Sequence, residues 1–341
     1  MGKFERGEAE KLERNVVDLL NNINVKDLHK CSQAVAKKIK EDFNIVKAEF
    51  IGRSYHEPGD IKLFLINGRI AYIELKLVES GKGTRANLGQ DALTKFGLFK
   101  GDRVLSWSEF RRNKNFDGIV LKKLRSYNYY NTASLLKYKG NEKERRGRYL
   151  RDLLRPKPGE AVESAVERAL ASYDQKIKEA AKIVKEILEL AMIDKLEYLK
   201  YLSSLEQDPE AIKKFAILVL LGVHKEDVMM KAYSEFYQFI KSLLGGNFIY
   251  RTYYVRKKSC EICVEDLTPL VDKLLRIRDF RVTFPENETN CIIEFFDPDS
   301  KRWRRLLRIV FHWKNVFQGI ATPCLNIFDE EVLKDTCFST T

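Results

Sequence analysis

The sequence predicts an α/β (α+β) protein with a mixed central sheet flanked by helices, a helical middle segment and a β-rich C-terminal part. Three observations predict this class. Near the N-terminus, an amphipathic segment precedes three strand-like segments joined by short turns. Between residues 160 and 244 the chain is rich in Ala, Glu, Lys and Leu at helical spacing. After Gly245 the composition changes to apolar and aromatic runs that are typical of strands.

The N-terminal part is predicted to form a helix followed by a β-meander. Apolar side chains recur at helical spacing after Asp27, which is the expected N-cap. Asn67 and Gly68 give a strong hairpin signal between two apolar runs, because both residues tolerate the positive φ angles of a type I′ turn. The expected helices cover residues 27–43 and 86–96, and the expected strands cover residues 46–52, 61–66 and 69–78.

Further elements are expected beyond residue 100. A short strand at 118–121 interrupts an otherwise irregular and basic stretch, and a long helical stretch at 160–205 is expected to break near Ile193 and Asp194. The other expected helices cover residues 209–221 and 225–244. The expected strands of the C-terminal part cover residues 248–255, 280–284, 291–296, 306–313 and 324–328.

The charge of the chain indicates a polyanionic partner. Lysine and arginine number 61 against 49 acidic residues, which gives a formal net charge of +12. Residues 110–157 hold fifteen of the basic residues and four acids, a net charge of +11, interleaved with tyrosines. Basic side chains contact phosphates and aromatic rings pack on sugars or bases, so this stretch is predicted to bind nucleic acid. The alternative is a solvated loop followed by a basic helix.

Apolar runs and cysteines bear on the cellular compartment. The longest apolar run, residues 215–223, is too short for a bilayer span, which needs about 20 apolar residues. No apolar segment follows the first residues, so a cytoplasmic protein with reduced thiols is expected. Cys260 and Cys263 have zinc-ligand spacing, but the sequence offers no second close pair to complete a zinc site.

One constellation of residues predicts chemistry. Asp60 opens the second predicted strand, and Glu74 and Lys76 lie on one face of the third. A tight hairpin joins these strands, so the two carboxylates are expected to form a hard-oxygen site for Mg²⁺, with the Leu75 carbonyl as a third ligand. Lys76 beside them can orient a metal-bound water for attack on a phosphodiester. The alternative is a surface hairpin with an exposed ion pair, which contributes under about 1 kcal/mol.

The motif Pro58-Gly59-Asp60, followed after thirteen residues by Glu74-Leu75-Lys76, resembles the PD-(D/E)xK nuclease superfamily in the form found in type II restriction endonucleases. The resemblance covers about residues 27–100. It implies a restriction-endonuclease-like core, in which a helix, a three-stranded meander, a helix and a further strand build a mixed sheet.

The same resemblance implies roles for single residues. Asp60 and Glu74 would be metal ligands, and Lys76 would be the catalytic lysine. Glu41 on the first helix and Gln90 on the following helix lie where relatives carry residues that support the site. Gly59, inserted between the proline and the aspartate, departs from the family pattern at its least constrained position.

Residues 80–90 follow the predicted catalytic strand directly. Their glycine amides and polar side chains offer donors for phosphates and base edges beside the cleavage site. The alternative is an ordinary flexible loop, whereas the spacing excludes a phosphate-binding P-loop. The expected DNA-binding residues are Lys82, Thr84, Arg85 and Asn87 in this loop, Arg145, Arg146 and Arg148 in the basic stretch, and Arg302, Arg304 and Arg305 in a second basic cluster.

Together these observations predict a Mg²⁺-dependent endonuclease that hydrolyses double-stranded DNA at specific sites, in the manner of a type II restriction endonuclease. We expect a catalytic core over residues 1–125, a basic and helical DNA-embracing segment over 126–245, and a β-rich part over 246–341 that either recognises DNA or completes the core sheet. The expected partners are double-stranded DNA and a second copy of the chain in a homodimer. A cognate DNA methyltransferase is expected as a genetic partner. No association with a membrane is expected.

Two alternative functions remain open at this point. The first is a structure-specific nuclease of DNA repair or recombination, which would use the same catalytic residues. The second is a nucleic-acid-binding protein without activity, in which the Asp, Glu and Lys set is accidental.

Overall fold

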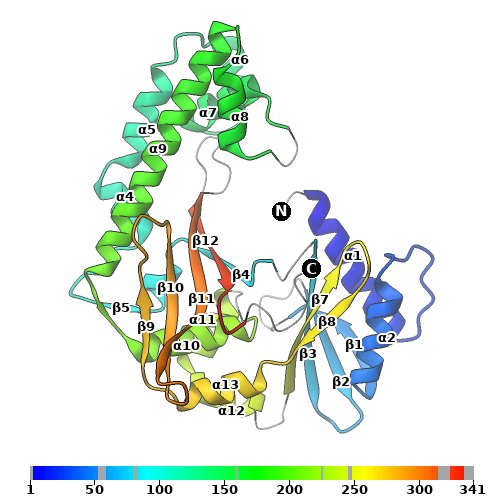
Figure 1. The fold of residues 1–341 in the computed structure, drawn as a ribbon. Helices are drawn as coiled ribbons and strands as arrows, with labels where there is room; N and C mark the ends of the chain where they lie inside the picture. The colour runs from blue at the N-terminus through cyan, green and yellow to red at the C-terminus, as the bar shows by residue number, and fades with distance from the viewer. Residues whose placement is uncertain are drawn as a thin grey trace.

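The computed structural model describes residues 3–52, 59–79, 83–157, 160–223, 226–244, 248–313 and 323–333 of the 341-residue chain. Helices combine with two five-stranded sheets and one two-stranded sheet, which is the mixed α/β class that the sequence predicts. In Figure 1 the two large sheets lie beside one another, and a group of helices extends away from the second. No helix in the described part of the chain is both long and apolar enough to cross a membrane.

The first sheet has the strand order β1-β2-β3-β7-β8. Its strands are β1 (Ile45–Phe50), β2 (Ile61–Leu65), β3 (Ile70–Val78), β7 (Phe248–Arg256) and β8 (Ile262–Glu265). The first three strands form the expected antiparallel meander. β7 pairs parallel with β3, and β8 pairs antiparallel with β7. The start of the C-terminal part therefore extends the sheet that the N-terminal strands begin.

One face of this sheet packs against two helices, α1 (Lys3–Leu20) and α2 (Ser32–Asp42). Alternation along β3 places Ala71, Ile73 and Leu75 in this core, as the sequence predicts, and leaves Glu74 and Lys76 on the opposite face. The sequence analysis did not identify α1. Asp27 is not the N-cap of α2, and its carboxylate lies 2.7 Å from the Lys11 ammonium on α1.

The second sheet has the order β4-β12-β11-β10-β9 and is antiparallel throughout. Its strands are β4 (Ala86–Gly89), β12 (Pro323–Asp329), β11 (Arg302–Trp313), β10 (Asn290–Asp297) and β9 (Phe280–Thr283). The helix predicted over 86–96 is wrong at its start, because Ala86 and Leu88 alternate with exposed residues and pair with β12. Only α3 (Ala92–Lys95) of that range is helical.

The remaining helices lie between and beside the sheets. They are α4 (Trp107–Asn113), α5 (Phe116–Arg125), α6 (Thr132–Leu135), α7 (Glu142–Leu154), α8 (Val162–Leu170), α9 (Gln175–Ser203), α10 (Pro209–Leu220), α11 (Glu226–Ser234), α12 (Phe236–Leu244) and α13 (Thr268–Arg276). In Figure 1, α5 to α8 and part of α9 form an arm at the far end of the second sheet. The short strands β5 (Phe99–Lys100) and β6 (Glu206–Gln207) pair with each other.

Two predictions for this region are wrong. Residues 118–121 belong to α5 and not to a strand. The helix expected to break near Asp194 is continuous there, because Asp194 is buried and accepts a 2.9 Å hydrogen bond from the Trp107 indole. The break falls earlier, where Asp174 caps α9 by accepting a hydrogen bond from the Lys176 amide at 2.8 Å.

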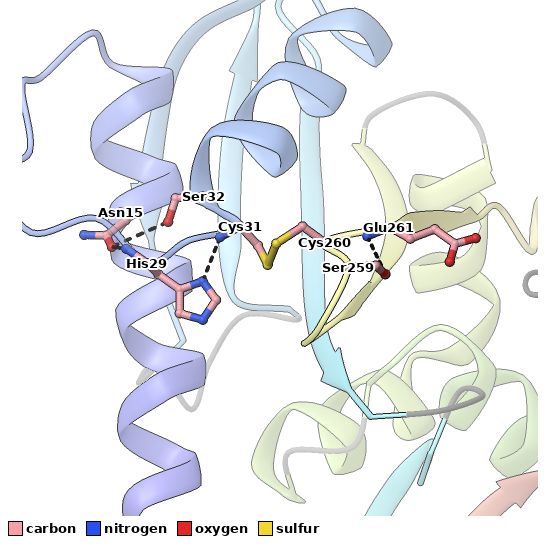
Figure 2. The surroundings of a disulfide bond; sticks show 7 residues. All are labelled: Asn15, His29, Cys31, Ser32, Ser259, Cys260 and Glu261. Atoms are coloured by element: carbon pink, nitrogen blue, oxygen red, sulfur yellow. Dashed lines mark hydrogen bonds between the residues drawn. A yellow bond between two sulfur atoms is a disulfide. The ribbon is translucent and has the colours of Figure 1, made fainter.

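A disulfide joins helix α2, which packs on the first sheet, to the turn between two strands of that sheet. Figure 2 shows Cys31, at the start of α2, bonded to Cys260 in the turn between β7 and β8, with the Cα atoms 5.1 Å apart. The His29 ring accepts a hydrogen bond from the Cys31 amide at 3.2 Å. Cys263 is also disulfide-bonded. The expectation of reduced thiols is therefore wrong for these residues, and Cys260 and Cys263 are not zinc ligands in this structure.

Candidate functional site

The structure brings Asp60 and β3 together at the expected place. Asp60 lies directly before β2, and its amide donates a hydrogen bond to the Ile73 carbonyl at 2.8 Å. The Leu75 amide in turn donates a hydrogen bond to Oδ2 of Asp60 at 3.0 Å. Two bonds therefore hold the Asp60 carboxylate beside Glu74, on the rigid frame of the meander.

Gly59 makes this approach possible. Its φ angle is +75°, which a side chain rarely tolerates, and a Cβ atom there would lie 2.8 Å from the Ile73 carbonyl oxygen. The glycine that departs from the family pattern thus lets the backbone before Asp60 come close to β3.

Glu74 is buried, with 7% of its surface exposed. Its Oε1 atom lies 3.2 Å from the Lys76 ammonium, whose side chain is 15% exposed. An exposed surface ion pair, the alternative left open by the sequence, does not describe these two residues. Burying a carboxylate is costly unless it is paired, so this arrangement needs partners around it.

Tyr250 on β7 is such a partner. Its hydroxyl donates a short hydrogen bond to Oε2 of Glu74. Burial, and then the charges of Glu74 and Asp60, raise the pKa of Tyr250 well above its usual value, so the hydroxyl stays protonated and donates. The Leu75 amide, which follows Glu74 directly in the chain, is the group that binds the Asp60 carboxylate.

Gly222 closes the other side of this pair. It follows α10 with a φ angle of +67°, and a Cβ atom there would lie 2.5 Å from Oε2 of Glu74 and would overlap the Tyr250 hydroxyl. The end of α10 therefore packs its backbone directly on the Glu74–Tyr250 pair, which only a glycine permits at this position.

Backbone carbonyls fix the position of Lys76. Its ammonium donates hydrogen bonds to the carbonyl oxygens of Arg85 at 2.5 Å and Thr84 at 3.3 Å. An ammonium has three donors, and the third is directed at Glu74. The lysine is thus held at one point between the two sheets rather than moving freely.

Arg85 links the two sheets and is not available to DNA in this structure. It is 3% exposed, and its guanidinium binds both carboxylate oxygens of Asp329 at the end of β12 and Oε2 of Glu265 on β8, the last at 2.7 Å. The hydrogen bond and charge of Asp329 and the charge of Glu265 raise the pKa of Arg85, although burial opposes them. The prediction that Arg85 contacts DNA is therefore corrected: its role is internal.

The donor set of the site fits a hard divalent cation. The carboxylates of Asp60 and Glu74 supply oxygens, and the Leu75 carbonyl points to the side of Asp60, because the N–H and C=O of one strand residue point the same way. Carboxylate and carbonyl oxygens are the ligands that Mg²⁺ prefers. Among the described residues no group of three or more His, Cys, Asp and Glu side chains is placed to hold a metal, so the protein would supply few ligands and water the rest.

The two supporting residues expected from the resemblance are not seen at the site. Glu41 is exposed on α2, and its ion pair in the described part of the chain is with Lys38 at 3.9 Å. Gln90 lies beyond β4, and its buried Oε1 atom has no hydrogen-bond partner among the described residues. Lys82 and Pro58 lie outside the described residues.

The expected DNA-binding residues of the basic stretch lie on α7. Arg146 pairs with Glu142 at 2.8 Å and stacks on the Tyr130 ring at 4.5 Å, and Arg148 donates to the Lys139 carbonyl at 2.9 Å. Arg145 is part-exposed on the same helix. These residues lie on the helical arm of Figure 1 rather than beside Lys76.

The second basic cluster lies at the start of β11. Arg302 and Arg304 both pair with Glu331, at 3.4 and 2.7 Å, whereas Arg305 faces Glu294 at 3.7 Å. In the loop before β4, Thr84 contributes its carbonyl to Lys76, and Asn87 within β4 is exposed. The DNA-binding roles of these residues stay predictions.

Comparison of the chain with protein-family models, with curated proteins and with solved structures gave no match. The residues and their geometry alone therefore carry the functional argument. Tyr250, Gly222 and Glu265 were not predicted from the sequence, since they lie far along the chain from Glu74. Two tyrosines on the same face of β7, Tyr250 and Tyr254, are a signal in the sequence for partners of the site. That signal can be interpreted only once β7 is known to pair with β3.

Proposed function

We propose that this protein is a Mg²⁺-dependent endonuclease that hydrolyses phosphodiester bonds of double-stranded DNA, with a PD-(D/E)xK core of the type II restriction endonuclease kind. The observation that carries the proposal is the cluster of the buried Glu74 with the part-buried Asp60 and Lys76 on the β2–β3 meander. A buried sheet that keeps two carboxylates and an ammonium beside each other, with dedicated partners for each, indicates a functional site.

The arrangement of the first sheet supports the same proposal. The family core needs a helix, a meander, a further helix and a further strand. Here α2 precedes the meander, and β7 lies parallel to β3 directly after α12. The residues between β3 and α12 form β4, which is the edge strand of the second sheet, and most of the helices. This insertion into the core is the part that would embrace DNA.

The residues divide the chemistry among themselves. Bound at the oxygens of Asp60, Glu74 and Leu75, Mg²⁺ would supply a Lewis acid that offsets charge building on the phosphate. Tyr250 holds the Glu74 carboxylate in one orientation. Lys76, fixed by the carbonyls of the loop before β4, places a positive charge beside the two carboxylates, where it would stabilise negative charge on an attacking water or on the phosphate.

Incubation of the whole protein with supercoiled plasmid, branched duplexes and short linear duplexes, with and without Mg²⁺, tests the proposal. Discrete fragments from plasmid DNA that appear only with Mg²⁺ are the expected result. Cleavage of branched duplexes alone would indicate a structure-specific nuclease. Mobility shifts without cleavage under any divalent cation would contradict a nuclease and indicate a binding protein.

A further inference from the structure

One face of the second sheet carries exposed and part-exposed polar side chains. Phe311, Leu325 and Ile327 point inward and are buried in the core with the helices. Strand alternation and pairing therefore point the neighbouring side chains outward. We call this the outer face; its polar members are Arg281, Glu294, Arg305, Arg308, His312 and, on β12 and β4, Asn326 and Asn87.

A bulge concentrates arginines on the outer face. The pairing of β10 with β11 shifts register between Ile293 and Glu294, so Arg305 and Arg308 both lie opposite outward residues of β10 although they are three positions apart. Arg281 on β9 lies opposite Glu294 from the other side. Three arginines thus come from two strands that flank β10.

A buried carboxylate lies beside Nε of each of these arginines: Arg281 donates a hydrogen bond through Nε, whereas Arg305 and Arg308 form ion pairs without a hydrogen bond. Glu294 lies 2.8 Å from Nε of Arg281 and 3.7 Å from Nε of Arg305, and Glu330 lies 3.0 Å from Nε of Arg308. The carboxylates are 9% and 7% exposed, whereas the arginine side chains are 42%, 55% and 38% exposed. Within the described part of the chain, no hydrogen bond engages the terminal nitrogens of these arginines.

Aromatic rings fix two of the guanidinium planes as well. The guanidinium of Arg281 lies 3.9 Å above the Trp303 ring, and that of Arg308 lies 5.3 Å above the Phe328 ring. An arginine held by Nε and by a ring has lost its side-chain freedom already, so it binds a further group at a lower entropic cost.

We propose that the outer face is a base-reading surface for duplex DNA that recognises guanine in the major groove. A guanidinium whose Nε is occupied presents its two terminal nitrogens as a fork, which matches the O6 and N7 acceptors of guanine. Glu294 is the one acid that the described strand residues contribute to this face, and it is buried and beside two arginines. The inference rests on the proposed function, because it takes DNA as the substrate.

The outer face also begins next to the candidate active site. Asn87 on β4 is exposed and lies opposite Asn326 on β12, and side-chain amides are the groups that pair with adenine edges. Asn87 follows Thr84, whose carbonyl holds Lys76, by three residues, which is at most roughly 10 Å of chain. A duplex read by this face is therefore near the residues proposed to cut it.

Selection of bound duplexes from a random-sequence library, with Ca²⁺ in place of Mg²⁺, tests the inference without relying on cleavage. The whole protein is expected to enrich guanine-containing sites. Arg308→Lys and Arg281→Lys keep the charge and lose the fork, so each should reduce the preference for one guanine about ten- to hundredfold while affinity for random DNA changes little. Arg276→Lys, an equally conservative change at the exposed end of α13, is the matched control and should leave the preference intact.

Glu294→Gln separates base reading from simple charge attraction. It removes a negative charge, so affinity for random DNA should rise, but it also releases Arg281 and Arg305, so the sequence preference should fall. Thermal melting confirms that the variant folds. Unchanged preference in both arginine variants, or a wild-type protein that enriches no sequence, would overturn the inference. A protein that enriches guanine sites but never cuts DNA would support the reading face and contradict the proposed nuclease.

Discussion

The hydroxyl of Tyr250 donates a hydrogen bond to Glu74 across 176 positions of the sequence, from the parallel strand that completes the first sheet. The proposed catalytic motif is therefore local in sequence, whereas the environment that orients it is not. Gly222 from α10 packs on the same pair, and Arg85 ties the loop that holds Lys76 to β8 and β12. Three distant parts of the chain thus meet around one glutamate and one lysine.

Replacement of Tyr250 by phenylalanine tests the role of this hydrogen bond. The change removes the donor and keeps the ring, so Glu74 loses its orientation, and the Mg²⁺ concentration for half-maximal cleavage should rise about ten- to hundredfold. Direct titration of Mn²⁺ binding provides a second readout that does not depend on turnover. The control is Tyr253, which lies on the opposite face of β7 and donates its hydroxyl hydrogen bond to Asp42. Tyr253→Phe should therefore change neither value. Equal metal requirements in wild type and Tyr250→Phe would argue against a positioning role.

Asp329, at the end of β12, holds the buried Arg85 guanidinium that reaches from the second sheet to Glu265 on β8 of the first sheet. Removing Asp329 takes away two hydrogen bonds of the buried guanidinium and leaves Glu265 to pair its charge, so Asp329→Ala is expected to lower the free energy of unfolding by about 3 kcal/mol, the lower end of the range for a broken buried pair. Glu331→Ala, which removes the exposed partner of Arg302 and Arg304, should cost under about 1 kcal/mol. Denaturant unfolding of the two variants measures the difference, and similar losses in both would contradict the link.

The Cys31–Cys260 disulfide closes a loop with a sequence separation of 229 residues. Replacing both cysteines by serine should lower the free energy of unfolding by about 2 to 5 kcal/mol, because the unfolded chain regains freedom. Mass spectrometry of the alkylated wild-type protein checks that the bond is formed. A double variant that unfolds at the same denaturant concentration as the oxidised wild type would show that the bond does not stabilise the fold.

Glu142 on the helical arm makes stability depend on pH. Hydrogen bonds from Arg125 and then Arg146 lower the pKa of Glu142 from 4.5 to about 2. Because the folded pKa is lowered, the stabilisation is fully present above pH 4.5 and is lost as the pH falls toward 2. The melting temperature of Glu142→Gln should therefore lie below that of wild type at pH 6 and approach it at pH 3. A gap that stays constant over this range would contradict the pairing.

The elements around the site were largely predictable from the sequence. Two apolar runs on either side of a strong turn signal predict β2 and β3, and alternation along β3 predicts the face of Glu74 and Lys76, because these signals depend on neighbours in the chain. The strands β7 and β9 to β12 were also found from composition. The helix predicted at Ala86 was wrong because pairing with β12 outweighs local propensity.

The partners of the site were not predictable in the same way. Tyr250, Gly222 and Arg85 act through contacts that need the sheet order, and no spacing in the sequence states that β7 lies parallel to β3. The sequence predicts Arg85 as a DNA-binding residue because an arginine in the loop after the proposed catalytic strand is expected to be exposed. Two acids from distant strands, Glu265 and Asp329, bury it instead.

The most direct test of the proposed nuclease compares cleavage and binding in three isosteric variants, Asp60→Asn, Glu74→Gln and Lys76→Met. Plasmid cleavage is measured with Mg²⁺, DNA binding with Ca²⁺, and folding by circular dichroism. The proposal predicts that each variant folds, binds DNA within about threefold of wild type and loses cleavage by at least about a thousandfold, because these groups act on the metal and water while affinity comes from basic surfaces. Undiminished Mg²⁺-dependent cleavage in any one of the three variants would contradict the proposed active site.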